Sequence, residues 1–122
     1  MMNNESLLLN LLCVKTHKAN ENWWVNIVTG QPLNRNVGEM LMLIVTELAE
    51  ALEGHRKDLM DDHLPHRKML EVEMADCIIR IFDFCGGLDL DLGGAYVEKM
   101  EYNKTRSDHQ IEQRKLSNGK KF

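Results

Sequence analysis

Apolar residues recur along most of the chain at intervals of three and four positions, which is the period of an amphipathic α-helix. The clearest run, NVGEMLMLIVTELAEALEGHRKD, predicts one long helix over residues 36–58. Asn36 is its candidate N-cap, because a short polar side chain there can accept a hydrogen bond from a free backbone N–H of the first turn. Glu39, three residues further on, completes a capping-box-like pattern.

The same period predicts three more helices, at about residues 7–20, from 65 or 66 to 85, and at 92–106. Ser6 can cap the first of them, and Gly86 and Gly87 are typical residues to end the second. Residues 107–122 are polar and basic and are interpreted as a tail. The chain shows no strand-like alternation and no internal repeat. We therefore expect one all-α domain over residues 1–122, similar to a four-helix bundle.

The segments between these helices have the composition of loops. Residues 20–36 are rich in Asn, Thr, Gly and Gln, contain Trp23 and Trp24, and include a TGQP stretch that predicts a turn. The connector at residues 59–65 is short. The two helices that it joins are therefore predicted to form an antiparallel hairpin.

Two acidic pairs lie within the helices of this hairpin. Glu47 and Glu50 are spaced i, i+3 on the first helix, and Glu73 and Asp76 have the same spacing on the second. Residues three apart lie on one side of a helix, so each pair can present two carboxylates to the neighbouring helix. Four carboxylates brought together would suit a hard divalent cation such as Mg²⁺, which prefers oxygen ligands.

The helix that carries the second pair is apolar over most of its circumference. Its polar residues form one narrow strip, which consists of Glu73, Asp76, Arg80 and Asp83. Such a strip faces either solvent or a polar site between helices. One pair of acidic residues at this spacing is usually a solvated helix surface. Two pairs, each in a strongly apolar helix, favour the polar site.

The spacing of the acidic residues resembles that of a known enzyme family. Glu47-x-x-Glu50, followed after 22 residues by Glu73-x-x-Asp76, is similar to the MazG-like branch of the all-α nucleoside triphosphate pyrophosphatases. Many members carry a further Glu at the start of the first motif, where this chain has Thr46. The four ligand positions are present, and any role of the additional Glu is lost.

A second resemblance to this family lies in the last long helix. Lys99, Asn103 and Arg106 form the pattern K-x-x-x-N-x-x-R, which resembles the phosphate-contacting element of the family. The closing NGKKF looks like the tail of small phage, bacterial and integron-borne members. The resemblance therefore extends from about Trp23 to the end of the sequence.

The resemblance implies Mg²⁺-dependent hydrolysis of a nucleoside triphosphate, often a deoxynucleotide, to the monophosphate and pyrophosphate, in nucleotide-pool housekeeping. Mn²⁺ would be able to substitute. The catalytic metal ligands would be Glu47, Glu50, Glu73 and Asp76, with one of the glutamates activating the attacking water. Lys99 and Arg106 would stabilise charge on the phosphates, and Asn103 would donate a hydrogen bond. A triphosphate can approach four carboxylates only when metal ions neutralise both.

Recognition of the base is assigned to the loop and to the end of the first helix. Trp23 and Trp24 can offer a stacking surface and His17 a polar contact, because stacking on an aromatic ring tolerates different bases. The alternative is that one tryptophan closes the core and the other lies at a subunit contact.

The composition limits which binding partners and which cellular compartment we expect for this protein. The net charge of −4 argues against general nucleic-acid binding. The cysteines Cys13, Cys77 and Cys85 have no metal-binding spacing and are expected to be small buried residues in a reducing compartment. The N-terminus resembles neither a signal peptide nor a membrane span, so we expect a cytoplasmic protein.

Two other classes of protein compete with the enzyme as explanations of this sequence. A non-enzymatic helical interaction module would explain the Met-rich apolar faces, because Met adapts to different partners, but it leaves the paired carboxylates unexplained. A carboxylate-bridged di-iron bundle requires E-x-x-H, and no Glu here has a His three residues later. The apolar surface of the helices, together with the family resemblance, predicts a homodimer or homotetramer.

Overall fold

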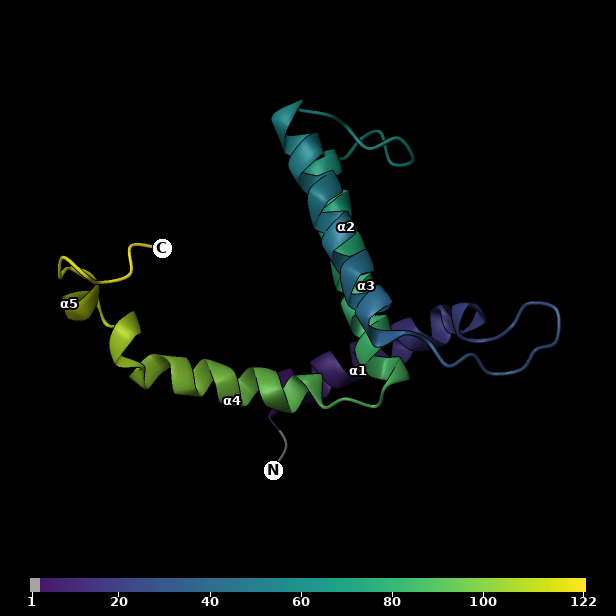
Figure 1. Ribbon diagram of the computed structural model, residues 1–122, viewed down its shortest axis with the longest axis horizontal. Helices are drawn as coiled ribbons and strands as arrows, with labels where there is room; N and C mark the ends of the chain where they lie inside the picture. Colours follow the sequence, from purple (N-terminus) through teal and green to yellow (C-terminus); the bar gives the residue numbers. More distant parts are fainter. Residues whose placement is uncertain (1–2) are drawn as a thin grey trace. The chain divides into compact units, whose positions relative to one another are not determined.

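The computed structural model describes residues 3–122, in which every regular secondary-structure element is a helix (Figure 1). The elements are α1 (Asn4–Ala19), η1 (Glu21–Trp24), α2 (Val37–Arg56), α3 (Met69–Gly87), α4 (Leu92–Thr105), η2 (Ser107–His109) and α5 (Ile111–Arg114). No strand is formed within residues 3–122, where β pairing is limited to two isolated bridges. The all-α prediction is confirmed.

The chain divides into two compact units, which are described separately. One consists of residues 3–10 with Asp91–Phe122, and the other of Leu11–Leu90. Across the described part of the chain, no helix has both the length and the apolar character that a bilayer span requires.

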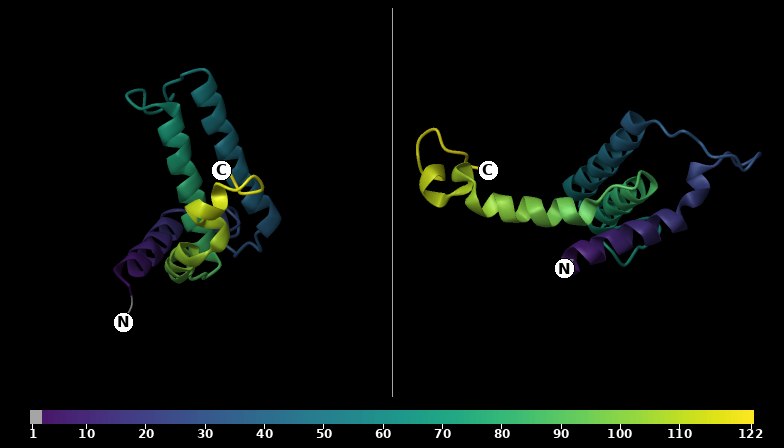
Figure 2. Two further views of the ribbon diagram at one scale, coloured as in Figure 1. Left: turned by 90° about the vertical axis from the view of Figure 1, so that its left-hand side faces the viewer. Right: turned by 90° about the horizontal axis from the view of Figure 1, so that it is seen from below.

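The main feature of the Leu11–Leu90 unit is the hairpin of α2 and α3, which overlap in Figure 1 and run side by side in the left view of Figure 2. The helices are antiparallel, because Cys77 donates its S–H to the carbonyl of Ile44 while Gly54 lies against Met69. Asn36 caps α2 as predicted, its Oδ1 accepting from the backbone N–H of Glu39 at 2.9 Å. The predicted hairpin is therefore present.

Helix α3 begins at Met69, three to four residues later than predicted. The cause lies in the connector, where the buried carboxylate of Asp61 accepts from the backbone N–H groups of His63 and Leu64. These local hydrogen bonds stabilise a turn where the sequence predicts the first turn of the helix. The bridge between Met60 and Lys68 then closes the connector.

Gly86 and Gly87 end α3 near the predicted residue, but the physical role predicted for them is wrong. Neither has the left-handed backbone of a C-terminal cap; Asp89 has it, with φ 54°. A Cβ at Gly86 would lie 2.5 Å from the carbonyl oxygen of Cys13, and one at Gly87 would overlap the ring of Trp24. These glycines let α1 and the tryptophan approach α3 closely.

The buried apolar residues are few and, apart from Met40, small: Cys13, Met40, Ala51, Cys77 and Cys85. All three cysteines are buried and unpaired with one another, which confirms that they are small buried residues. No large side chain among the described residues is fully buried. The hairpin therefore contains a thin core for its length.

The other unit is organised around α4. Asp91 caps this helix by accepting from the N–H of Gly94 at 2.8 Å, and Asn10 bonds both to Asp91 and to the N–H of Gly93. The stretch 107–122, interpreted from sequence as a tail, contains η2 and α5. Arg114 and Lys121 each donate to backbone carbonyls within it.

Candidate metal centre

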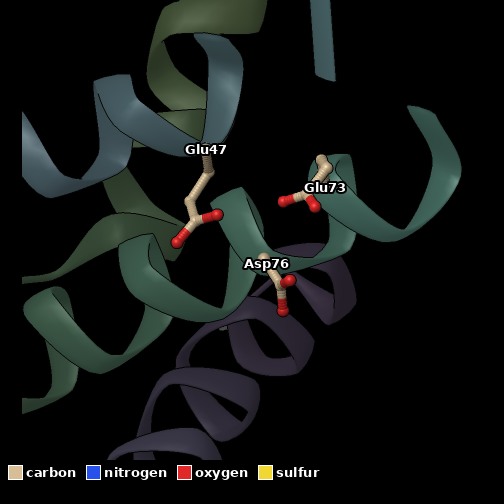
Figure 3. Close-up of side chains that lie close together, drawn as sticks. All are labelled: Glu47, Glu73 and Asp76. Carbon is tan, nitrogen blue, oxygen red and sulfur yellow. The ribbon is translucent and has the colours of Figure 1, made fainter. Parts of the chain in front are cut away.

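The α2–α3 hairpin brings three of the predicted carboxylates together. Glu47 of α2 and Glu73 and Asp76 of α3 each offer an oxygen, and these oxygens all lie within 4.8 Å of one another (Figure 3). Figure 3 shows the carboxylate of Glu73 directed towards Glu47. Glu73 and Asp76 of the polar strip thus lie at a polar site between α2 and α3, which is the arrangement that the two acidic pairs favour over a solvated helix surface.

Glu73 is the central residue of this cluster. It is only 7% exposed, and its Oε2 has no hydrogen-bond partner. Burial, followed by the neighbouring carboxylates of Glu47 and Glu50, raises the pKa of Glu73 to about 7. A buried carboxylate oxygen without a donor is costly unless a proton or a metal ion compensates it.

Asp76 and Glu50 are the other two carboxylates, besides Glu47 and Glu73, that the sequence predicts as metal ligands. Burial first, and then the charge of Glu47, raises the pKa of Asp76, while the nearby Arg80 opposes the change. Glu50 is exposed and lies outside the group of three, although its charge contributes to the raised pKa values of Glu73 and Asp76. Carboxylate oxygens are the ligands of hard divalent cations, so the donor set fits Mg²⁺.

Arg80 is a site residue to which the sequence analysis gave no role. Its Nε donates to Oε1 of Glu47 at 2.5 Å, across the interface between α3 and α2. The available signal was its position in the polar strip, four residues after Asp76 on the same side of the helix.

A pocket of about 660 Å³ opens beside the cluster. Glu47, Asp76 and Arg80 form part of its wall, together with Trp23 and Arg35 from the loop before α2. Trp23 is 71% exposed, so its ring is available for stacking. Arg35, another residue that sequence reasoning missed, donates to the carbonyl of Trp23 at 2.9 Å.

Trp24 and His17 are placed differently from Trp23. Both donate to Oδ1 of Asp83, from Trp24 Nε1 at 3.0 Å and from His17 Nδ1 at 2.9 Å, because a carboxylate can only accept. Their rings meet edge to face with centroids 4.9 Å apart. Neither residue is part of the pocket wall, and their contacts anchor the loop to α1 and α3.

The predicted phosphate ligands belong to the α4 unit. Lys99 is exposed, with Nζ 4.8 Å from the ring centroid of Tyr102. Asn103 has a buried Oδ1 without a partner. Arg106 forms two hydrogen bonds with Asp108, which hold the pKa of that carboxyl well below its usual range. Their assignment to phosphates stays a prediction.

Searches of protein-family models, curated proteins and solved structures find no match to this chain.

Proposed function

We propose that the chain is a Mg²⁺-dependent pyrophosphohydrolase of MazG-like type, which hydrolyses ribo- or deoxynucleoside triphosphates in cytoplasmic nucleotide-pool housekeeping. The observation that carries the proposal is Glu73, a buried carboxylate without a donor in a cluster of acidic residues. Beside it lies a pocket that offers an exposed aromatic ring and two arginines.

The residues have distinct roles in this proposal. Glu47, Glu73 and Asp76 hold the metal, with Glu50 as the fourth ligand. When bound, Mg²⁺ neutralises the phosphate oxygens and lowers the pKa of a coordinated water. Trp23 stacks on the base, and Lys99, Asn103 and Arg106 are assigned to the phosphates on the motif resemblance alone.

The cleavage position and the nucleotide class rest on the resemblance in the motifs. The metal requirement has independent physical support. A triphosphate carries several negative charges, and three carboxylates within 4.8 Å would repel it in the absence of a divalent cation.

A substrate panel tests the proposal directly. The purified chain is incubated with each ribo- and deoxynucleoside triphosphate and Mg²⁺, and pyrophosphate and orthophosphate are measured separately. We expect pyrophosphate with the monophosphate, and no release after chelation of the metal. Orthophosphate alone, or no product from any nucleotide, would contradict the proposal.

A ligand variant tests the site assignment in the same assay. Asp76→Asn removes one ligand charge and should lower pyrophosphate release at least 100-fold, while the helical circular dichroism stays unchanged. Glu71→Gln is the matched control, because Glu71 is an exposed acidic residue of α3 that forms a surface ion pair with Arg67 at 3.6 Å. Full activity in Asp76→Asn would remove this residue from the site.

A non-enzymatic interaction module remains the second candidate. Exposed apolar side chains on both hairpin helices favour it, among them Leu41, Met42, Val45, Leu48, Met74 and Ile78. It predicts a protein whose stability does not respond to Mg²⁺, which distinguishes it from the first proposal.

A further inference from the structure

A positively charged side chain, that of Arg80, lies within the acidic cluster. Arg80 Nε lies 2.5 Å from Oε1 of Glu47, in the space between the helices where the carboxylates meet. The side chain of Glu47 is 11% exposed, whereas that of Arg80 is 42% exposed. The carboxylate of Glu47 is therefore largely enclosed between the helices, while a large part of the Arg80 side chain is exposed to solvent.

The pairing uses only part of the guanidinium. Arg80 has five N–H donors, and within residues 3–122 the Nε–H to Glu47 is its sole hydrogen bond to the protein. Arg80 also lines the 660 Å³ pocket. Its terminal nitrogens are thus available for an anionic ligand, and a guanidinium matches the paired oxygens of a phosphate.

A divalent cation and Arg80 compete for the same carboxylate. The three acidic oxygens lie within 4.8 Å of one another, so a metal ion bound there would lie close to the Glu47 carboxylate that Arg80 contacts. Two positive groups at such a distance repel each other. The unpartnered Oε2 of Glu73 is a second attraction for the metal, which Arg80 does not satisfy.

We propose that Arg80 is the counterion of the metal-free cluster, that a divalent cation displaces it from Glu47, and that the released guanidinium then binds a phosphate of the substrate in the pocket. The displacement depends only on the acidic cluster. The phosphate contact rests on the proposed function and deepens it, since it adds a substrate ligand within the Leu11–Leu90 unit.

The displacement is tested by Mn²⁺ binding without nucleotide at pH 8, measured from the electron paramagnetic resonance signal of free Mn²⁺. Arg80→Gln should bind Mn²⁺ about tenfold more tightly than the original chain, because the competing charge is gone. Arg56→Gln removes the same charge at an exposed ion pair with Glu53 and should leave the affinity unchanged. Unchanged or weaker binding in Arg80→Gln would overturn the displacement.

A second variant distinguishes an effect of the lost charge from misfolding of Arg80→Gln. Arg80→Lys keeps the positive charge but loses the planar fork, so its Mn²⁺ affinity should match that of the original chain. If Arg80 were only a structural pair for Glu47, both variants would bind Mn²⁺ more weakly and unfold at lower temperature.

The phosphate contact is tested with inorganic triphosphate as probe, at saturating Mn²⁺, by calorimetry. Both Arg80 variants should bind the probe about tenfold more weakly, whereas Arg56→Gln should not. Unchanged probe affinity would overturn this second step alone. Absence of pyrophosphate release from the original chain would instead refute the enzymatic proposal, and the Mn²⁺ result would be unaffected.

Discussion

At the scale of single residues, Glu73 links stability to pH. Its pKa rises from 4.5 to about 7 on folding, mainly because the carboxyl is buried. A carboxyl with a raised pKa binds its proton more tightly in the folded state, so the folded state gains stability at low pH. This contribution is complete below about pH 4.5 and is lost as the pH rises through about 7. Asp76 shifts in the same direction.

We therefore expect the metal-free protein to become less stable between pH 5 and pH 8. The shift at Glu73 corresponds to about 3 kcal/mol in the free energy of unfolding. Urea unfolding in the presence of a chelator measures it. In Glu73→Gln, which mimics the protonated form, the decrease should be much smaller, and Mg²⁺ should stabilise the original chain most at pH 8. A decrease of equal size in the variant would assign the effect to other groups.

The two neighbouring tryptophans should have different roles, Trp23 in nucleotide binding and Trp24 in stability. Trp23 is exposed at the pocket, so Trp23→Ala should raise KM for the nucleotide about tenfold and leave the melting temperature unchanged. Trp24 packs on Gly87 and donates to Asp83, so Trp24→Ala should cost about 2–3 kcal/mol of stability. Kinetics and thermal unfolding of both variants check this. The same response from both would refute the distinction.

Sequence could predict the acidic residues but not their partners. The spacing of Glu73 and Asp76 follows directly from helical geometry, and three of the four predicted ligands do meet. The Arg80–Glu47 pair depends on the register between two helices, and the different surroundings of Trp23 and Trp24 depend on how an irregular loop folds. Neither is a property of local sequence.

At the scale of elements, local chemistry decided which boundaries could be predicted. The start of α2 was predictable because Asn36 caps it through a contact within three residues. The start of α3 was not, because Asp61 bonds to the connector backbone and delays the helix to Met69. The composition of the connector gave no measure of that competition.

The contact between α1 and α3 should depend on the absence of a side chain at Gly86. In Gly86→Ala the added Cβ would lie 2.5 Å from the carbonyl oxygen of Cys13 and 2.7 Å from Cβ of His17. We expect a loss of about 1–3 kcal/mol in stability, measured by thermal unfolding, because backbone must move. Gly38→Ala is the control: its Cβ would meet only Asn36 Oδ1 at 3.3 Å, and alanine favours the helix. A stabilised Gly86→Ala would refute the close contact.

At the scale of the whole molecule, many apolar side chains of the hairpin helices are exposed, whereas few are buried. The buried apolar residues are mostly small, yet α2 and α3 expose Leu41, Met42, Val45, Leu48, Leu52, Met74 and Ile78. The sequence already indicated this excess, because α3 is apolar over most of its circumference. Which residues would be covered by a partner could not be predicted, since that depends on how two copies meet.

We expect the active protein to be at least a homodimer that buries part of this hairpin surface. Exposed apolar patches of more than a few hundred Å² are uncommon on monomers, and two-fold pairing is the commonest way to cover them. Light scattering at low micromolar concentration should give a mass of at least twice 14.1 kDa. Met42→Glu, which places a charge on the exposed face of α2, should dissociate the assembly and lower its melting temperature, whereas Glu112→Gln on α5 should not. A mass near 14.1 kDa with full activity would show that the hairpin functions alone.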